Sequence, residues 1–477
     1  MKFYRFLFIA TITLIGTVVF AKDFNVKDFG AVGDGQTVDS PAIQRAIDAC
    51  EEAGGGKVIV PHGEYLAATI QIKNNVTLHV SKGAVILGVT DPTQYVNVDP
   101  FIDGIGQNRG TALIAAVEVK NIGLEGEGVI NGRGTSLAMP DGSRMTLRPF
   151  LLRIVRCEGV VVKNITLINS AAWTTHFFES KYITIDGIKI RSRGMGNNDG
   201  IGIDCSSNIR ISNCDIDSGD DALVFKTTSP KMPCKDIVVT GMRLKSDHGA
   251  IKMGTESTAP FEDIKISDCY IYDTNNGGIK LLTVDGAKLR NIEISDITME
   301  NVRTAMLFRL GARMRVFRSD DEVQPVGVFE NVVIKNVKVK ISEISQLKYP
   351  TGIMITGIPN HYINGLTLEN IEMNLPGGGT KQEVNVVVPE AIDQYPEIKT
   401  FGPSIPAYGV WARHARNLTL RNISFSTQKT DMRPALFFED VKGATIDHVR
   451  IPIVPEKEEE FRRISSENIS INQSNVY

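Results

Sequence analysis

The chain has 477 residues, of which 42% are hydrophobic and 22% are charged, and its formal net charge at pH 7 is −3. These proportions are typical of a globular protein, and the length allows either two or three average domains or one long repetitive one. Because phosphate binding needs clustered positive charge, the acidic balance argues against nucleic acid as a partner.

Residues 1–21 have the pattern of an export signal. Lys2 and Arg5 make the start positive, an apolar stretch follows, and the small residue Ala21 suits the cleavage position. The apolar stretch is shorter than the roughly 20 residues that span a bilayer, so a membrane anchor is the weaker interpretation. We therefore expect cleavage after Ala21, a mature domain of residues 22–477 in the periplasm or outside the cell, and no stable membrane insertion.

One helix is predicted near the start of the mature domain. Ser40 is a capping residue, Pro41 suits the first turn, and Gly54 marks the end. Such a helix would cover the open N-terminal end of a stack of strands, whose exposed edges otherwise invite aggregation. Its apolar stripe comprises Ala42, Ile43, Ala46, Ile47 and Cys50.

A pattern of two short alternating strands, separated by one Gly, Asn or Asp, recurs along most of the chain. Copies begin at Ile183, Ile209, Ile237, Ile264 and Ile292, so the spacings are 26, 28, 27 and 28 residues. A period near 27 indicates a solenoid, and because its units are strands the predicted fold is all-β, a single right-handed parallel β-helix with the helix as N-terminal cap. The residue between the strands tolerates the left-handed conformation of a sharp corner. A β-sandwich is the alternative, but it would not give so regular a period.

Later spacings are longer, which predicts inserted loops near 303–328 and 374–410. The charged run from Glu456 suggests a polar C-terminal cap. Cys214 and Cys269 occupy the same apolar position of two repeats, so buried free thiols are expected there rather than a disulfide.

Acidic residues, a histidine and a lysine follow one another on consecutive repeats. Asp199, the pair Asp220 and Asp221, His248 and Lys280 fall at similar points of successive windings. Windings stack at roughly 4.8 Å, so these side chains should form a ladder about 14 Å long on one face. An acid and a base roughly 6.5–9.5 Å apart leave room for the water of inverting glycoside hydrolysis. A lone Asp-Asp is usually solvated surface, but this coincidence on consecutive rungs favours an active site.

These motifs resemble those of glycoside hydrolase family 28, the polygalacturonase-like enzymes. Asn197-Asn198-Asp199 is similar to the family's Asn-Thr-Asp motif, Gly219-Asp220-Asp221 matches Gly-Asp-Asp, and His248-Gly249 matches His-Gly. Gly278-Ile279-Lys280 resembles Arg-Ile-Lys but lacks its arginine. The likeness extends over about residues 23–454.

The resemblance implies a role for each matching residue. Asp220 would be the general acid, Asp199 and Asp221 would activate water, His248 would tune the protonation of Asp220, and Lys280 would bind a uronate carboxylate.

Further substrate-binding residues are suggested by their phase in the repeat. Arg309, one rung beyond Lys280, is predicted to substitute for the missing arginine. Lys226 and Lys252 extend a basic strip that would locally overcome the acidic net charge. Trp173 and His176 lie on the rung before Asp199, where an aromatic face suits stacking on a sugar ring.

The predicted function is therefore that of an exported inverting hydrolase that cleaves α-linked galacturonic acid, or a related acidic sugar, in pectic polysaccharide. The inserted loops favour trimming from chain ends. The expected partner is an acidic poly- or oligosaccharide, and neither a cofactor nor a metal is expected. Two alternatives stay open: a polysaccharide lyase or epimerase of the same fold, with Ca²⁺ on Asp199, Asp220 and Asp221, and a non-catalytic carbohydrate-binding β-helix.

Overall fold

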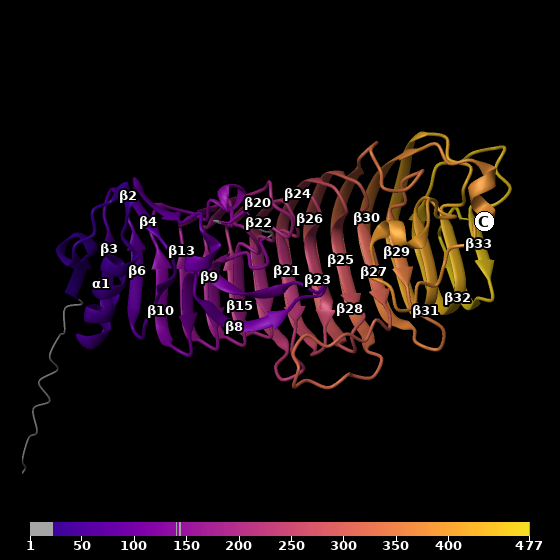
Figure 1. Ribbon diagram of the computed structural model, residues 1–477. Helices are drawn as coiled ribbons and strands as arrows, with labels where there is room; N and C mark the ends of the chain where they lie inside the picture. Colours follow the sequence, from indigo (N-terminus) through magenta and orange to yellow (C-terminus); the bar gives the residue numbers. More distant parts are fainter. Residues whose placement is uncertain (1–21, 140, 143–144, 477) are drawn as a thin grey trace, which may run out of the picture.

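The computed structural model describes residues 22–139, 141–142 and 145–476, so the predicted export signal lies outside the described residues. The strands coil into one long right-handed parallel β-helix, which confirms the predicted fold class (Figure 1). Equivalent strands of successive windings pair in parallel and form three ladders along the coil.

The first ladder begins at β1 (Lys22–Asn25) and runs the length of the coil. From β22 (Cys234–Ser246) onward, one long strand in each winding turns the corner and belongs to both the first and the second ladder. The first ladder continues through β3 (Gly56–Val60), β6 (Val76–Val80), β10 (Lys120–Glu125), β13 (Glu158–Lys163), β16 (Lys181–Asp186), β19 (Ser207–Ser212), β22 (Cys234–Ser246), β24 (Phe261–Thr274), β26 (Lys288–Val302), β28 (Val328–Ile341), β30 (Ile363–Gly377), β31 (Val410–Lys429), β32 (Leu436–Arg450) and β34 (Glu467–Asn472).

The other two ladders complete each winding. The second comprises β2 (Asp34–Val38), β4 (Gly63–Ala67), β7 (Ala84–Gly88), β11 (Val129–Asn131), β14 (Thr166–Ile168), β17 (Lys189–Ser192) and β20 (Asp215–Ser218) before it joins β22. The third comprises β5 (Ile70–Gln71), β9 (Asn108–Val117), β12 (Phe150–Val155), β15 (Thr175–Phe178), β18 (Ile201–Asp204), β21 (Leu223–Thr227), β23 (Gly249–Ser257), β25 (Gly277–Thr283), β27 (Met306–Leu310), β29 (Ile353–Thr356), the first parts of β31 and β32, and β33 (Phe461–Ile464).

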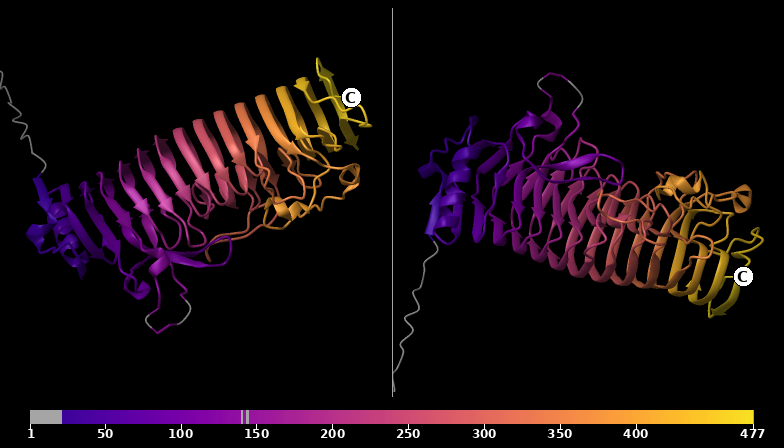
Figure 2. Two further views of the ribbon diagram at one scale, coloured as in Figure 1. Left: turned by 90° about the horizontal axis from the view of Figure 1, so that it is seen from above. Right: turned by 60° about the horizontal axis from the view of Figure 1, so that its bottom comes forward.

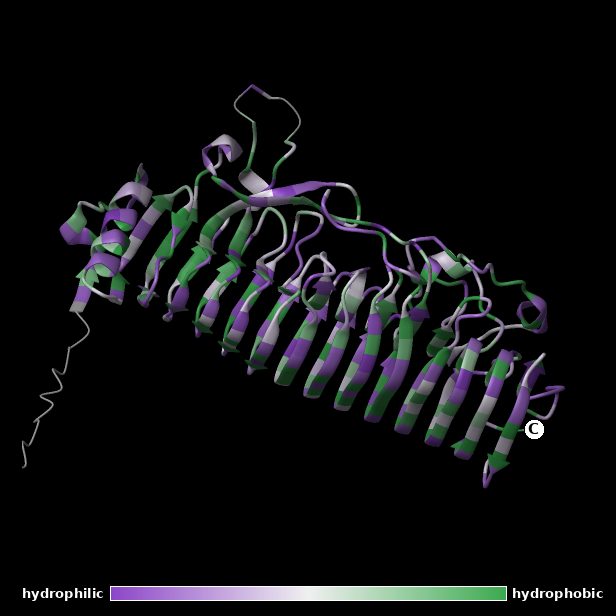
Figure 3. Cartoon of the chain, turned by 90° about the horizontal axis from the view of Figure 1, so that it is seen from below, coloured by the Kyte–Doolittle hydropathy of each residue, from purple (hydrophilic) through white to green (hydrophobic). Residues whose placement is uncertain are grey.

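The register is the one that the repeat predicted. Ile183 pairs with Ile209, which pairs with Ile237, and the series continues through Ile264 to Ile292. These side chains are buried in one continuous core inside the coil, while the residues between them face outward, so hydropathy alternates along the strands of the first ladder (Figure 3). The corner residues have positive φ, for example 66° at Gly187, 55° at Asn213, 54° at Asp268 and 57° at Asp296.

Helix α1 (Ser40–Glu52) is the one α-helix among the described residues, and it packs on the first winding as expected. Its predicted apolar stripe is buried. The predicted cap is wrong by one residue: Asp39 is the N-cap, and its carboxylate accepts hydrogen bonds from the backbone of Val32 and Gly33 instead of the helix. The hydroxyl of Ser40 accepts a hydrogen bond from the backbone of Ala68. In the described part of the chain, no helix is long and apolar enough to cross a bilayer.

Insertions leave the coil on one side (Figure 2). Strand β8 (Asn97–Ile102) pairs antiparallel with β9, and long connections occupy residues 311–327 and 378–409, close to the two predicted loops. The short 3₁₀ helices lie mostly in such connections: η1 (Val26–Phe29), η2 (Pro92–Gln94), η3 (Gly134–Ser136), η4 (Lys381–Asn385) and η5 (Ile398–Phe401).

Two further expectations can be compared with the structure. The C-terminal segment forms strands β33 and β34, which extend the coil, so the expected polar cap is in fact a further winding. Cys214 and Cys269 are buried free thiols, as predicted, and the other four cysteines are also buried and unpaired.

Candidate active site

Asp220 and His248 occupy neighbouring positions in adjacent windings, at the corner that leads into the third ladder. The backbone N–H of Asp220 donates to the carbonyl of Asn198 (3.4 Å), and that of Asn276 donates to the carbonyl of His248 (3.1 Å). His248 Nδ1 lies 4.0 Å from Asp220 Oδ1. One row of the coil therefore presents Asn198, Asp220, His248 and Asn276 in order.

A second row, one residue further along the chain, carries the other two carboxyls. The N–H of Gly200 donates to the carbonyl of Asp221 (2.8 Å), and the N–H of Ala222 donates to that of Gly249 (2.9 Å). Asp199 and Asp221 are thus in register and next to the first row. The predicted gathering of Asp199, Asp220, Asp221 and His248 is present, although Lys280 belongs to a different row, in register with Lys252.

The three carboxyls differ in their ionisation. Burial, reinforced by the charge of Asp220, raises the pKa of Asp199 well above its usual value. Burial and the charge of Asp221 likewise raise the pKa of Asp220. Burial also acts on Asp221, but the ammonium of Lys252 outweighs it and lowers the pKa of that carboxyl. Such a divergence of pKa values is what separates an acid from a base in one site.

Access distinguishes the carboxyls as well. The Asp220 side chain is 14% exposed, whereas those of Asp199 and Asp221 are 3% and 2% exposed. Asp220 Oδ1 accepts a hydrogen bond from the N–H of Asp221 (2.8 Å). The carboxyl most open to a ligand is therefore one whose pKa is raised.

The three predicted lysines do lie beside the carboxyls, but each is buried and paired within the protein. Lys226 Nζ lies 3.0 Å from Glu256 Oε2 and 3.6 Å from Asp199 Oδ2. Lys252 Nζ lies 2.6 Å from Asp221 Oδ2. Lys280 Nζ lies 3.1 Å from Oε2 of Glu397, which comes from the insertion 378–409. The expected basic strip is thus neutralised by internal carboxylates.

The prediction that Trp173 and His176 stack on a sugar is wrong, because both side chains are buried. The His176 ring packs between those of Phe101 (5.6 Å) and Phe150 (5.3 Å). Burial lowers the pKa of His176 to about 4. The Trp173 ring is covered by Lys226 Nζ, 4.5 Å from its centroid. The hairpin of β8 and β9, which the repeat did not reveal, supplies much of this covering.

The assignment of Arg309 to substrate binding is also wrong. Its guanidinium is buried and donates to the backbone carbonyls of Gly357, Glu390 and Ala391, at 3.1, 2.9 and 2.8 Å. Arg309 pairs in register with Leu282, two residues beyond Lys280. It therefore fastens the insertion 378–409 to the coil.

Position 278 does not face the cleft. A Cβ at Gly278 would lie 2.5 Å from Sδ of Met299, a residue of the core. An arginine side chain on this backbone would point into the core. Local packing therefore favours glycine at position 278.

Three charged residues of the site were not predicted from the sequence: Arg148, Glu256 and Glu397. Arg148, in the connection before β12, donates to Gly196 O (2.6 Å), Asn197 Oδ1 (2.7 Å) and Gln107 Oε1 (2.8 Å). Among the described residues, no carboxylate lies within ion-pair distance of Arg148. Glu256, at the end of β23, is the buried partner of Lys226. Repeat phase gave no signal for Arg148 or Glu397, because both lie in insertions.

A cavity of about 390 Å³ opens beside the acidic row. It is a concave space next to groups with shifted pKa values, which is how binding sites commonly present themselves. Its lining consists of His248, Asn276, Gln346, Glu397 and Lys399.

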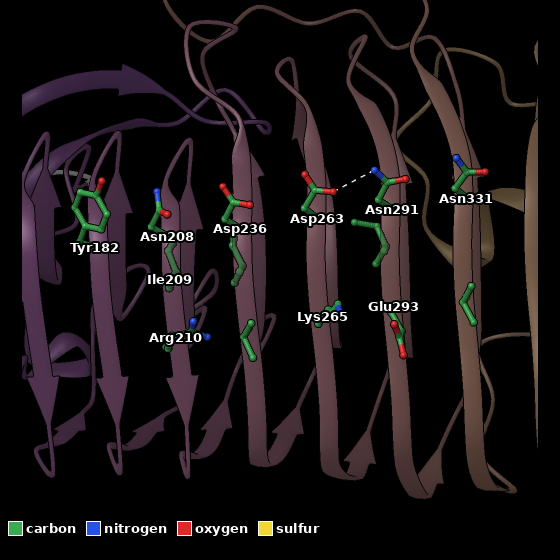
Figure 4. Close-up of a pocket in the computed structure, with 14 residues that line it drawn as sticks. Tyr182, Asn208, Ile209, Arg210, Asp236, Asp263, Lys265, Asn291, Glu293 and Asn331 are labelled. Carbon is green, nitrogen blue, oxygen red and sulfur yellow. Dashed lines mark hydrogen bonds between the residues drawn. The ribbon is translucent and has the colours of Figure 1, made fainter.

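A larger hollow of about 930 Å³ lies elsewhere, on the outer face of the first ladder (Figure 4). Corner residues such as Asn208, Asp236, Asp263 and Asn291 follow one another along its edge, and Asn291 Nδ2 donates to Asp263 Oδ1 (3.1 Å). Such a row satisfies the polar groups of the coil itself, and the hollow contains none of the groups that the site brings together.

Within the described residues, no three His, Cys, Asp or Glu side chains are arranged to hold a metal ion. Asp199 and Asp221 instead face lysine ammonium groups.

Residues 50–391 match the glycosyl hydrolases family 28. The chain belongs to this family. It is a polygalacturonase-like glycosidase, as the motifs predicted.

Relatives agree with this assignment. The family 28 chain is 27% identical over 386 residues to a probable polygalacturonase of Vitis vinifera, covering 76% of each protein. It is 24% identical to an exo-poly-alpha-D-galacturonosidase of Dickeya chrysanthemi, covering 57% of this chain and 53% of that one.

Solved structures of the same fold include two bacterial exopolygalacturonases. The one from Thermotoga maritima is 25% identical, with a TM-score of 0.62, covering 74% of this chain and 87% of that one. The one from Yersinia enterocolitica is 19% identical, with a TM-score of 0.70, covering 94% of this chain and 78% of that one. The second likeness concerns the fold.

Proposed function

We propose that this family 28 chain is an exported, inverting hydrolase that cleaves α-linked galacturonic acid in pectic polysaccharide from chain ends. The observation that carries the proposal is the divergence within one cluster: the pKa of Asp220 is raised and that of Asp221 is lowered. The proton is thereby favoured on Asp220 and disfavoured on Asp221, which is the division of roles that acid–base hydrolysis requires.

The chemistry follows from these states. Asp220, the most exposed of the three carboxyls, donates its proton to the glycosidic oxygen as the bond from that oxygen to the anomeric carbon breaks. Water adds to the anomeric carbon from the opposite face, and its proton passes to Asp221, with Asp199 beside it. His248, 4.0 Å from Asp220, acts on the protonation of the acid. A single displacement of this kind inverts the anomeric configuration.

An acidic sugar is supported by Arg148. Its guanidinium is near enough to Asp199 and Asp220 for their charges to act on it, and its hydrogen bonds go to neutral acceptors. In this proposal Arg148 takes the role that sequence reasoning gave to Lys280, and it meets the carboxylate of the sugar next to the acids. The names of the Vitis and Dickeya relatives are consistent with galacturonate.

Action at chain ends is supported by contacts between insertions. Arg318 Nη2 lies 2.8 Å from Asp99 Oδ2, and the N–H of Ile102 donates to the carbonyl of Phe317 (3.3 Å), so the β8–β9 hairpin joins the connection 311–327. The N–H of Gly104 donates to Glu256 Oε1 (2.9 Å), beside Lys226. These contacts join the insertions into a wall beside the windings that carry the acidic row.

Export rests on residues 1–21 of the sequence. If the proposal holds, mass spectrometry of the protein recovered from the periplasm or medium should find a mature chain that begins at Lys22. A chain that retains Met1 in the cytoplasm would contradict it.

The central test is digestion of trigalacturonic acid followed by NMR of the first product. We expect galacturonic acid released one residue at a time, with the β anomer formed first from the α linkage. Retention of configuration would refute inversion, and an unsaturated product that absorbs in the ultraviolet would indicate a lyase. Because every cleavage of a trimer gives one monomer and one dimer, action at chain ends is tested on hexagalacturonic acid, where dimers or trimers among the first products would refute it.

A further inference from the structure

The carboxylate of Glu397 reaches the cleft from the insertion 378–409 and lies against Lys280. Glu397 Oε2 is 3.1 Å from Lys280 Nζ, and it also accepts a hydrogen bond from Nδ2 of Asn276. Although burial acts to raise its pKa, the charges of Lys280 and Lys252 lower it, so Glu397 stays ionised. The ammonium expected to bind a sugar carboxylate already has an anionic partner.

Glu397 is held there by a firmly anchored segment. Arg413 donates to the carbonyls of Val388 and Pro389, both at 2.7 Å, and Arg309 holds the next two carbonyls. Ile398 is fully buried in a hydrophobic cluster shared with strands of the third ladder. Glu397 is therefore a fixed part of the cavity wall.

Two other side chains of the cavity, Asn276 and Gln346, have hydrogen-bond acceptors without donors. Among the described residues, no donor lies within hydrogen-bond distance of the buried atoms Oδ1 of Asn276 and Oε1 of Gln346, while their amide nitrogens donate to Glu397 and to the carbonyl of Asn275. A buried acceptor without a donor is costly, so it favours a ligand that supplies one. Lys399 is the cation of the lining, and its side chain is exposed.

A sugar hydroxyl donates to such acceptors, whereas an ionised carboxylate only accepts and is repelled by Glu397. We infer that this cavity is a subsite for a sugar residue that has no free carboxylate, a neutral or esterified residue, and that Glu397 is its specificity-determining residue. The inference rests on the proposed function. In that function Arg148 binds the carboxylate of one sugar residue beside Asp220, and Glu397 excludes the carboxylate of a second sugar residue beside His248.

The test compares three trigalacturonides: unesterified, methyl-esterified at one end, and methyl-esterified at the other. We expect the wild type to cleave one of the two esters with a kcat/KM about tenfold or more above that of the free acid. The reason is that a free sugar carboxylate would lie next to the negative charge of Glu397, whereas the ester carries no charge. Glu397→Gln should bring that ratio close to one by accelerating cleavage of the free acid. Asp393→Asn, an exposed carboxylate of the same insertion, is the matched control and should keep the wild-type ratio.

Two further variants guard against a misfolded protein. Lys280→Gln combined with Glu397→Gln removes both charges and should also give a ratio near one. Gln346→Leu leaves the ion pair intact and should lower kcat/KM for the preferred ester about fivefold or more, because it removes an acceptor for a sugar hydroxyl.

The outcomes separate the two proposals. A wild-type preference for the free acid over both esters, or a preference unchanged in Glu397→Gln, would overturn the inference while leaving the hydrolase intact. If no trigalacturonide is cleaved, the proposed function fails. In that case, the affinities of the three oligosaccharides for the Asp220→Asn variant, measured by calorimetry, still decide whether Glu397 disfavours a sugar carboxylate.

Discussion

Lys252 Nζ lies 2.6 Å from Oδ2 of Asp221, and this buried contact sets Asp221 apart from the carboxyls around it. Without it, burial and neighbouring negative charge would raise the pKa of Asp221, as they do for Asp199 and Asp220. The ion pair therefore favours the negative charge on Asp221 over the other two carboxyls.

Replacing the proposed acid should abolish most activity. Asp220→Asn cannot protonate the leaving oxygen, so kcat on trigalacturonic acid should fall by a factor of about 10²–10⁴ with little change in KM. Reducing-sugar release measures the effect. Asp236→Asn, at an exposed corner of the outer face, keeps a residue suited to positive φ and should retain full activity. Unchanged kcat in Asp220→Asn would exclude acid catalysis by this residue.

The pH profile should respond to Lys252. In Lys252→Met the pKa of Asp221 is no longer lowered, so the acidic limb of kcat/KM against pH should move to higher pH. Loss of one partner of a buried pair should also cost about 3–5 kcal/mol of unfolding free energy. Lys245→Met removes a partly exposed pair with Asp273 (3.3 Å) and should cost less than about 1 kcal/mol. Equal losses in the two variants, measured with urea, would contradict this account.

Asp199 should lower stability at neutral pH. Its pKa in the folded state is raised above that of the unfolded chain, so the folded state binds the proton more tightly. Stability from this group is therefore present below the unfolded pKa, about 3.9, and is lost as pH rises through the folded value. Asp199→Asn should be more stable than the wild type at pH 7, and the difference should disappear near pH 3. A neutral-pH loss of stability would instead show that the contact with Lys226 dominates.

Arg309 should act on the insertion rather than on the sugar. Arg309→Gln leaves the carbonyl of Glu390 without a donor and removes one of the two donors to the carbonyl of Ala391, which should cost about 1–3 kcal/mol. The loosened segment should become sensitive to trypsin at Lys399, as seen by limited proteolysis and mass spectrometry. Arg421→Gln, on the exposed outer face, serves as the control. A raised KM with normal resistance to trypsin would restore the original assignment to substrate binding.

Arg148 should recognise the acidic group of the substrate. Arg148→Gln loses charge-assisted hydrogen bonds worth about 1.5–3 kcal/mol, so kcat/KM on trigalacturonic acid should fall about 10- to 100-fold. The loss should shrink on the oligosaccharide esterified at the sugar that Arg148 reads. An equal loss on all three trigalacturonides would mean that Arg148 only positions Asn197.

Residues within the coil were the predictable ones. The period of Ile183, Ile209 and Ile237 gave the register, because each apolar side chain must reach the same interior. The same phase placed Asp220 beside His248. The repeat predicted Lys280 in the same row as Asp199, but in the structure Lys280 is in register with Lys252. The prediction failed because the strands of the third ladder begin after corners of unequal length.

Contacts made by insertions were not predictable from the repeat. Glu397 is 117 residues from Lys280 along the chain and has no phase in the repeat, so nothing in the local pattern joins them. His176 looked available for a sugar because the rings of Phe101 and Phe150 that cover it come from outside its own winding.

The sequence by itself therefore determined the coil, its register and the row of acidic side chains. The reason is that the repeated apolar side chains are all buried together only when successive windings stack in register. Only the tertiary structure decided which of those side chains carry charge and which cations are free to meet a ligand. Ionisation depends on burial and on the nearest opposite charge, and here those charges arrive from distant insertions such as the one that carries Glu397.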